Sequence, residues 1–284
     1  MHPGWIVGWL VAGLVAAVLL GIAFLPPSWG AAALLHPHRR TVNPAGVPAH
    51  REVAIPDGEV VLHGWLFPAR PPRRGLLIYL HGLGDNRLSG VGVAQRFGPL
   101  GWDVLTYDQR AHGESGGAAC TYGYYEKYDL GRALDVLGVG RAVVMGSSLG
   151  GSVALQAAAV EPRIAAVIAQ SPFADLERIA REHAPFFANE TYIRAALRLS
   201  EQEASFHISG VSPVRDAPKI RVPVLLLHGQ KDREVPPAHS QQLAAALPAP
   251  PELMLLPTAD HNDVLAREES WAAIARFLDK IPPG

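Results

Sequence analysis

Cysteine is almost absent from this chain, since its 284 residues include only Cys120. One cysteine can form neither an intramolecular disulfide nor a cysteine-rich zinc site. The sequence therefore excludes a disulfide-stabilised secreted scaffold and a zinc finger. A lone thiol is usually buried and incidental, and we expect that role for Cys120.

Net charge is also nearly absent, because 25 basic and 26 acidic residues leave a formal charge of −1. Without a basic excess there is no case for a nucleic-acid partner. No pair among His183, His207 and His239 has metal-ligand spacing with a matching carboxylate. We therefore predict no nucleic acid, no metal and no cofactor.

Long uncharged apolar stretches are confined to the amino terminus, where residues 5–25 run for 21 residues without a charge. That length can cross the roughly 30 Å hydrocarbon layer as a helix. A cleaved signal peptide is the alternative, with the alanines at 31–33 as its cleavage site, although no Lys or Arg precedes the apolar run. We predict a transmembrane anchor at 1–28 and a linker at 29–50.

The basic residues nearest this stretch suggest its orientation. Arg39 and Arg40 follow the apolar run, whereas nothing basic precedes it. Basic residues favour the cytoplasmic side of a membrane. The expected localisation is a single-pass membrane protein with its main domain in the cytoplasm.

The remaining chain alternates short apolar runs with helical stretches, which indicates one α/β domain over residues 51–282. Runs that are apolar at every position predict strands buried on both faces of a mainly parallel sheet. An Asp-Gly turn at 57–58 predicts a leading hairpin, which brings the count to eight strands. The predicted strands are 53–55, 60–67, 76–80, 104–107, 142–145, 165–169, 224–227 and 253–256. Residues 174–217 contain only helical patterns and predict a helical cap over the sheet edge.

The pentapeptide Gly146-Ser147-Ser148-Leu149-Gly150 lies between a predicted strand and a predicted helix. A Gly-x-Ser-x-Gly string in that context predicts a sharp turn that exposes a nucleophilic serine, and its frame selects Ser148. The flanking glycines are needed because larger residues would clash at such a corner. The N–H of Leu149, at the start of the helix, is a natural donor to an oxyanion.

A serine hydroxyl needs a base, and the base needs an acid that orients it. Asp232 and His261 each follow a predicted buried strand, and parallel strands open their carboxyl ends at one edge. We predict Ser148, Asp232 and His261 as a triad. Asp260 is a poor orienter because neighbouring side chains point apart, and Asp263 is expected to begin the last helix.

Five ordered motifs connect the chain to a known family: His81-Gly82-Leu83-Gly84, residues 108–115, the Ser148 turn, His228-Gly229-x-x-Asp232 and Asp260-His261. The chain resembles α/β-hydrolase serine hydrolases of the Bem46 type, the alpha/beta hydrolase domain-containing proteins 13 and 17, and monoacylglycerol-lipase-like enzymes. The resemblance covers about residues 50–280. It implies the N–H of Leu83 as second oxyanion donor and a structural role for the side chain of His81.

Within the second motif, the resemblance implies that Asp108 and Arg110 brace neighbouring turns. One position departs from the family pattern. Ala111 stands where the family often has glycine, which affects the expected backbone of that loop rather than the triad.

Together these residues predict a membrane-anchored serine hydrolase that cleaves carboxylic ester or thioester bonds through an acyl-enzyme. A serine peptidase or amidase of the same fold and a catalytically silent binding protein remain alternatives. The expected partners are a small-molecule or lipid-like acyl ester and, through the amino-terminal helix, a membrane. Apolar side chains of the cap favour medium or longer acyl groups; they are Phe173, Phe186, Phe187, Tyr192, Ile193, Leu197 and Phe206.

Overall fold

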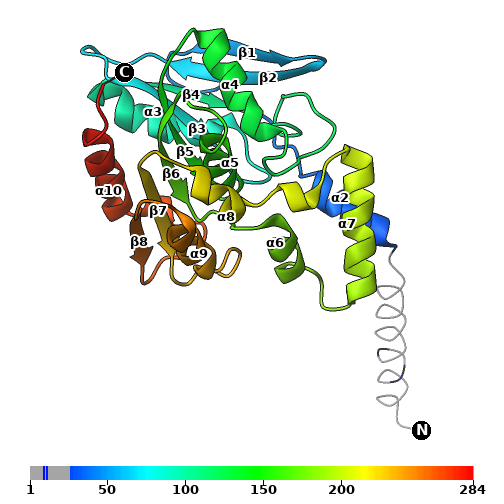
Figure 1. Ribbon diagram of the computed structural model, residues 1–284. Helices are drawn as coiled ribbons and strands as arrows, with labels where there is room; N and C mark the ends of the chain where they lie inside the picture. Colours follow the sequence, from blue (N-terminus) through cyan, green and yellow to red (C-terminus); the bar gives the residue numbers. More distant parts are fainter. Residues whose placement is uncertain (1–8, 10, 12–25, 284) are drawn as a thin grey trace.

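A computed structural model describes residues 9, 11 and 26–283 (Figure 1). Its centre is one eight-stranded sheet in the order β1-β2-β4-β3-β5-β6-β7-β8. Only β1 with β2 and β2 with β4 pair antiparallel, and the other neighbours pair parallel. The strands are β1 (Arg51–Asp57), β2 (Val60–Phe67), β3 (Gly75–Leu80), β4 (Trp102–Tyr107), β5 (Ala142–Ser147), β6 (Ile164–Gln170), β7 (Val224–Gly229) and β8 (Glu252–Leu256).

Helices cover both faces of this sheet (Figure 1). The described helices are α2 (Pro27–Leu35), α3 (Val91–Phe97), α4 (Glu126–Leu137), α5 (Leu149–Ala158), α6 (Leu176–Glu182), α7 (Glu190–Ala204), α8 (Pro213–Asp216), α9 (Ala238–Ala246) and α10 (Glu268–Asp279). The predicted α/β fold, with eight mostly parallel strands and flanking helices, is therefore confirmed.

Two apolar layers explain why the strands are apolar at every position. Ile78 packs in the layer that includes α4 and α5, whereas its neighbour Leu77 packs in the layer that includes α3 and α10. Successive strand side chains point to opposite faces, so a sheet covered on both sides buries all of them. Both residues are fully buried.

The predicted cap region contains α6, α7 and α8, and no strand lies within residues 174–217. In Figure 1, α7 is the part of this region that lies farthest to the right, and α2 packs beside α7. The close approach of these two helices depends on a small residue. A Cβ added to Gly30 of α2 would lie 3.1 Å from the Cβ of Ala196 and 3.3 Å from the ring of Tyr192.

The segment predicted as a linker, residues 29–50, is partly a packed helix. Ala31 and Leu35 of α2 are buried, and the carbonyl of Leu35 accepts a hydrogen bond from the N–H of Cys120 at 2.9 Å. The guanidinium of Arg39 donates to the carbonyl of Ser115 at 2.6 Å. We correct the linker prediction accordingly: Ala31 and Leu35 are buried against the domain, so the first part of this segment is not a free connector.

The predicted single-pass membrane localisation also requires correction. Across residues 9, 11 and 26–283, no helix has both the length and the apolar character needed to cross a bilayer. Helix α2 has 9 residues, whereas a span needs about 20. Most of the predicted anchor, residues 1–28, lies outside the described residues. We withdraw the single-pass localisation and the cytoplasmic orientation that depended on it.

Candidate active site

Ser148 occupies a sharp corner between β5 and α5, with φ 52° and ψ −113°. Such a backbone is unfavourable for a residue with a side chain and persists only where the surroundings fix it. Here the N–H of Ser148 donates to the carbonyl of Gln170 at 2.7 Å. A Cβ on Gly146 would lie 2.2 Å from the backbone of Gly150, and one on Gly150 would lie 2.2 Å from the carbonyl oxygen of Leu80. The corner therefore requires both glycines.

Asp232 and His261 meet beyond the carboxyl ends of β7 and β8. Nδ1 of His261 lies 2.7 Å from Oδ2 of Asp232. The other carboxylate oxygen accepts the backbone N–H groups of Glu234 at 3.0 Å and Val235 at 2.8 Å. Both oxygens of Asp232 are thus held, which fixes the orientation of the imidazole.

The rival carboxylates are oriented into their own loop. Asp260 accepts the N–H groups of Asn262 at 3.0 Å and Asp263 at 3.2 Å. Asp263 precedes a short 3-10 turn and pairs with Arg267. The expectation that Asp263 begins the last helix is wrong, because α10 starts only at Glu268.

The ionisation of the pair follows from burial and contact. Burial opposes the charge of Asp232, but hydrogen bonds from His228 and His261 outweigh it and hold the pKa of this carboxyl well below its usual range. Burial also disfavours a charged His261, yet the hydrogen bond to Asp232 and its negative charge raise the pKa of the imidazole above 6.5. The imidazole is therefore a stronger base than a free histidine.

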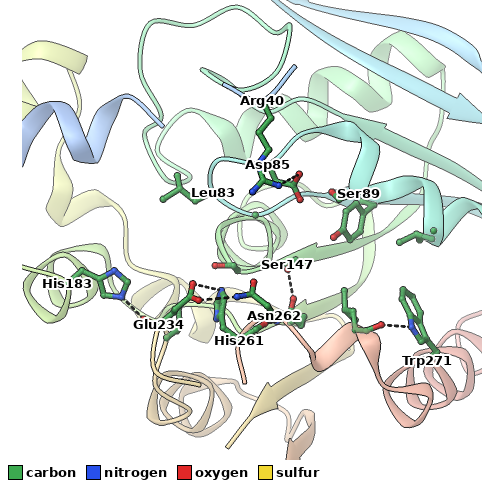
Figure 2. Close-up of a pocket in the computed structure, with 18 residues that line it drawn as sticks. Arg40, Leu83, Asp85, Ser89, Ser147, His183, Glu234, His261, Asn262 and Trp271 are labelled. Carbon is green, nitrogen blue, oxygen red and sulfur yellow. Dashed lines mark hydrogen bonds and ion pairs between the residues drawn. The ribbon is translucent and has the colours of Figure 1, made fainter. Parts of the chain in front are cut away.

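Ser148 and His261 line one cleft of about 580 Å³, shown in Figure 2. Leu83 forms part of its wall, and a Cβ on the preceding Gly82 would lie 3.7 Å from the Cβ of Ser148. Leu149 is the first residue of α5, so its N–H has no acceptor within the helix. Polar side chains on the rest of the wall include Arg40, Asp85, Glu234 and Asn262.

The chain is similar to known proteins in sequence and in fold. A family model described as the alpha/beta hydrolase fold matches residues 75–211. The Bacillus subtilis protein YqkD is 30% identical over 217 residues, which cover 72% of this chain and 71% of YqkD. The chain belongs to the alpha/beta hydrolase family.

Relatives in this alpha/beta hydrolase family include named enzymes. An esterase of Pyrococcus furiosus, Pf2001, superposes with a TM-score of 0.70 and 25% identity, covering 87% of this chain and 99% of its own. The 2,6-dihydropseudooxynicotine hydrolase of Paenarthrobacter nicotinovorans is 30% identical over 227 residues, which cover 77% of this chain and 58% of that enzyme. The fold and these neighbours support hydrolase activity.

The first two alpha/beta hydrolase motifs form a buried scaffold beneath the cleft. Nδ1 of His81 bonds the carbonyl of Gly82 at 2.8 Å, and its Nε2 accepts the N–H of Gln109 at 3.0 Å. Burial first, and then the neighbouring His112, lower the pKa of His81 to about 3. The side chain is therefore a neutral structural group.

The loop that follows β4 is braced by two buried ion pairs. Asp108 pairs with Arg87, and Arg110 pairs with Asp129. Ala111, where the family often has glycine, adopts φ 61°. This departure places an alanine in the left-handed region that favours glycine.

Gln170, at the end of β6, is a residue that our sequence reasoning did not find. The hydroxyl of Ser147 donates to its Oε1, and its Nε2 donates to the carbonyl of His261 at 3.1 Å. With its carbonyl bound to Ser148, this one residue contacts both sides of the site. Its only sequence signal is its position at the carboxyl end of a strand that adjoins the nucleophile strand.

His228 is a second residue of the site whose role the sequence did not indicate. It is fully buried, and its Nε2 lies 3.2 Å from Oδ2 of Asp232 and 2.7 Å from the carbonyl of Val235. Its signal in the sequence is its position at the start of the motif that contains Asp232.

Proposed function

We propose that this chain is a serine hydrolase of the Bem46-like kind that cleaves carboxylic ester or thioester bonds. The observation that supports this most is the pair of Asp232 and His261 beside the strained corner of Ser148. A carboxylate held by two N–H groups and bound to a histidine is what a serine needs to become nucleophilic. The polar cleft gives a small-molecule ester access to that serine.

In this proposal the first half-reaction transfers an acyl group to the enzyme. Oγ of Ser148 attacks the ester carbonyl carbon while His261 takes the hydroxyl proton. The N–H groups of Leu83 and Leu149 stabilise the oxyanion, and losing one such donor costs about 3 kcal/mol of barrier. The intermediate collapses, the alcohol or thiol leaves with the proton from His261, and the acyl group stays on Ser148.

The second half-reaction uses water in the same geometry. His261 removes a proton from water, the resulting oxygen attacks the acyl carbon, and Ser148 recovers its proton as the carboxylic acid departs. Asp232 remains ionised throughout and stabilises the imidazolium that forms twice in each cycle. Its low pKa agrees with that role.

The test is labelling with a fluorophosphonate probe, followed by mass spectrometry of the labelled peptide. We expect modification of Ser148, loss of labelling in Ser148→Ala, and retained labelling in Ser147→Ala. Matched p-nitrophenyl ester, thioester and anilide substrates then compare the three bond types. Absence of labelling would favour a silent binding protein, and faster anilide than ester cleavage would favour an amidase.

A further inference from the structure

A second cavity, of about 240 Å³, lies between α2, α6 and α7. It shares two wall residues with the cleft of Ser148, namely Leu83 and His183. Figure 2 shows both of them on the side of the cleft opposite Trp271. The two cavities are therefore neighbours that meet at this pair of side chains.

The wall of the second cavity presents carbon to its interior. Over the described residues it includes no Asp, Glu, Lys or Arg side chain. Its hydroxyl groups already have acceptors: Tyr122 donates to the carbonyl of Leu34 at 2.8 Å, Tyr192 to that of Pro26 at 3.3 Å, and Ser200 within α7 at 3.0 Å. A ligand there gains little from polar groups and most from apolar burial.

Small side chains leave this space open between helices that otherwise pack closely. They are Gly30, Ala33, Ala180, Ala184, Ala188 and Ala196, and the aliphatic wall is completed by Leu34, Ile193 and Leu197. The aromatic lining expected from the sequence is mostly elsewhere. Phe186 is 87% exposed, whereas Phe173 and Phe206 are buried in the core.

We propose that this cavity holds the acyl chain of the ester whose carbonyl is attacked by Ser148. The chain passes between Leu83 and His183, and the alcohol or thiol portion stays against the polar wall of the cleft. The reaction in this inference rests on the proposed function, whereas binding of an apolar chain in the cavity does not depend on it. At about 30 Å³ for a water-sized group, the cavity holds roughly eight methylene-sized groups, so the preferred substrates are medium-chain acyl esters.

The experiment fills the cavity from its α2 wall. Ala33→Phe is compared with Ala32→Phe, which adds the same side chain to an exposed neighbour that does not line the cavity. The readout is the ratio of kcat/KM for p-nitrophenyl octanoate to that for p-nitrophenyl acetate. Each excluded methylene lowers this ratio by up to about fourfold. We expect a fall of about tenfold or more in Ala33→Phe and no change in Ala32→Phe.

A second pair of variants fills the cavity from α7. Ile193→Trp enlarges a residue of the cavity wall, and Leu199→Trp is the control because Leu199 does not line the cavity. Calorimetric binding of 1-octanol to each variant on a Ser148→Ala background gives a readout that needs no catalysis. Weaker 1-octanol binding in the filled variants, together with no ester hydrolysis by the protein that keeps Ser148, would support the cavity and reject the proposed function. Active variants with unchanged chain-length ratios would overturn the acyl cavity and keep the proposed function.

Discussion

Gln170 shows how one uncharged side chain can couple two halves of a site. Its amide lies between the hydroxyl of Ser147 and the carbonyl of His261, so the serine strand and the histidine loop share one anchor. It does not carry charge or protons in the proposed reaction. We therefore regard it as a positioning residue that acts through His261.

Replacing this anchor should affect turnover more than binding. In Gln170→Ala the histidine loop loses its tether, and misplacement of the base lowers kcat by up to about 100-fold, with KM within about twofold. Steady-state kinetics with an ester measures the split. Ser147→Ala, which keeps the bond from Gln170 to His261, is expected to lose much less. Equal losses of kcat in the two variants would reject the tether.

Asp232 and His261 predict a specific pH dependence. The base works as neutral imidazole, and its raised pKa keeps it protonated up to a higher pH than an ordinary histidine. The acidic limb of kcat/KM should therefore lie above pH 6.5. In Asp232→Asn the attraction is gone, so the limb should move to lower pH while activity falls by up to about 10⁴-fold. A limb that stays in place would show that Asp232 does not control the base.

At the scale of elements, the strand-to-helix corner depends on contacts that allow no methyl group. Gly150→Ala places a Cβ against the backbone of Leu80 and should lower the free energy of unfolding by about 1–3 kcal/mol or more. Gly140→Ala is the matched control, because nothing lies within 4 Å of its added Cβ. Urea denaturation of both variants measures the difference. Equal midpoints would mean that the corner can relax.

The strands could be predicted because burial on both faces of the sheet makes every position of a strand apolar. The run at 224–227 predicts the start of β7 correctly, and the strand continues through His228 and Gly229, which are polar or lack a side chain. The apolar pattern does not extend to such residues. His228, for example, is buried through hydrogen bonds with Val235 and Ser240. The edges of elements near the site were therefore less predictable than their centres.

The sequence could indicate the candidate site residues that each have a chemical role of their own. It could not indicate the residues that act through contacts with other residues. Ser148, Asp232 and His261 follow from strand ends and from the chemistry of a nucleophile. The roles of Gln170 and of the cavity beside α2 depend on contacts between distant segments, which no local pattern records. Leu35 illustrates this: it looks like part of a linker in sequence and is completely buried in the fold.

For the molecule as a whole, α2 is part of the folded body although it precedes the sheet by many residues. Leu35→Ala should lower the free energy of unfolding by about 2–5 kcal/mol, because a fully buried leucine is truncated. Trp29→Ala, on the same helix and 62% exposed, should change it by far less. Chemical denaturation of the two variants provides the comparison, and similar losses would mean that α2 is not integral to the domain.

The burial of the single thiol has a practical consequence for spectroscopy. Cys120 is fully covered, its N–H is bonded to α2, and burial raises the pKa of its thiol well above the usual value. Maleimide reagents need an accessible thiolate and will therefore leave the native protein unmodified. New cysteines at exposed positions of α2 and α7 can carry fluorophores with the native residue in place.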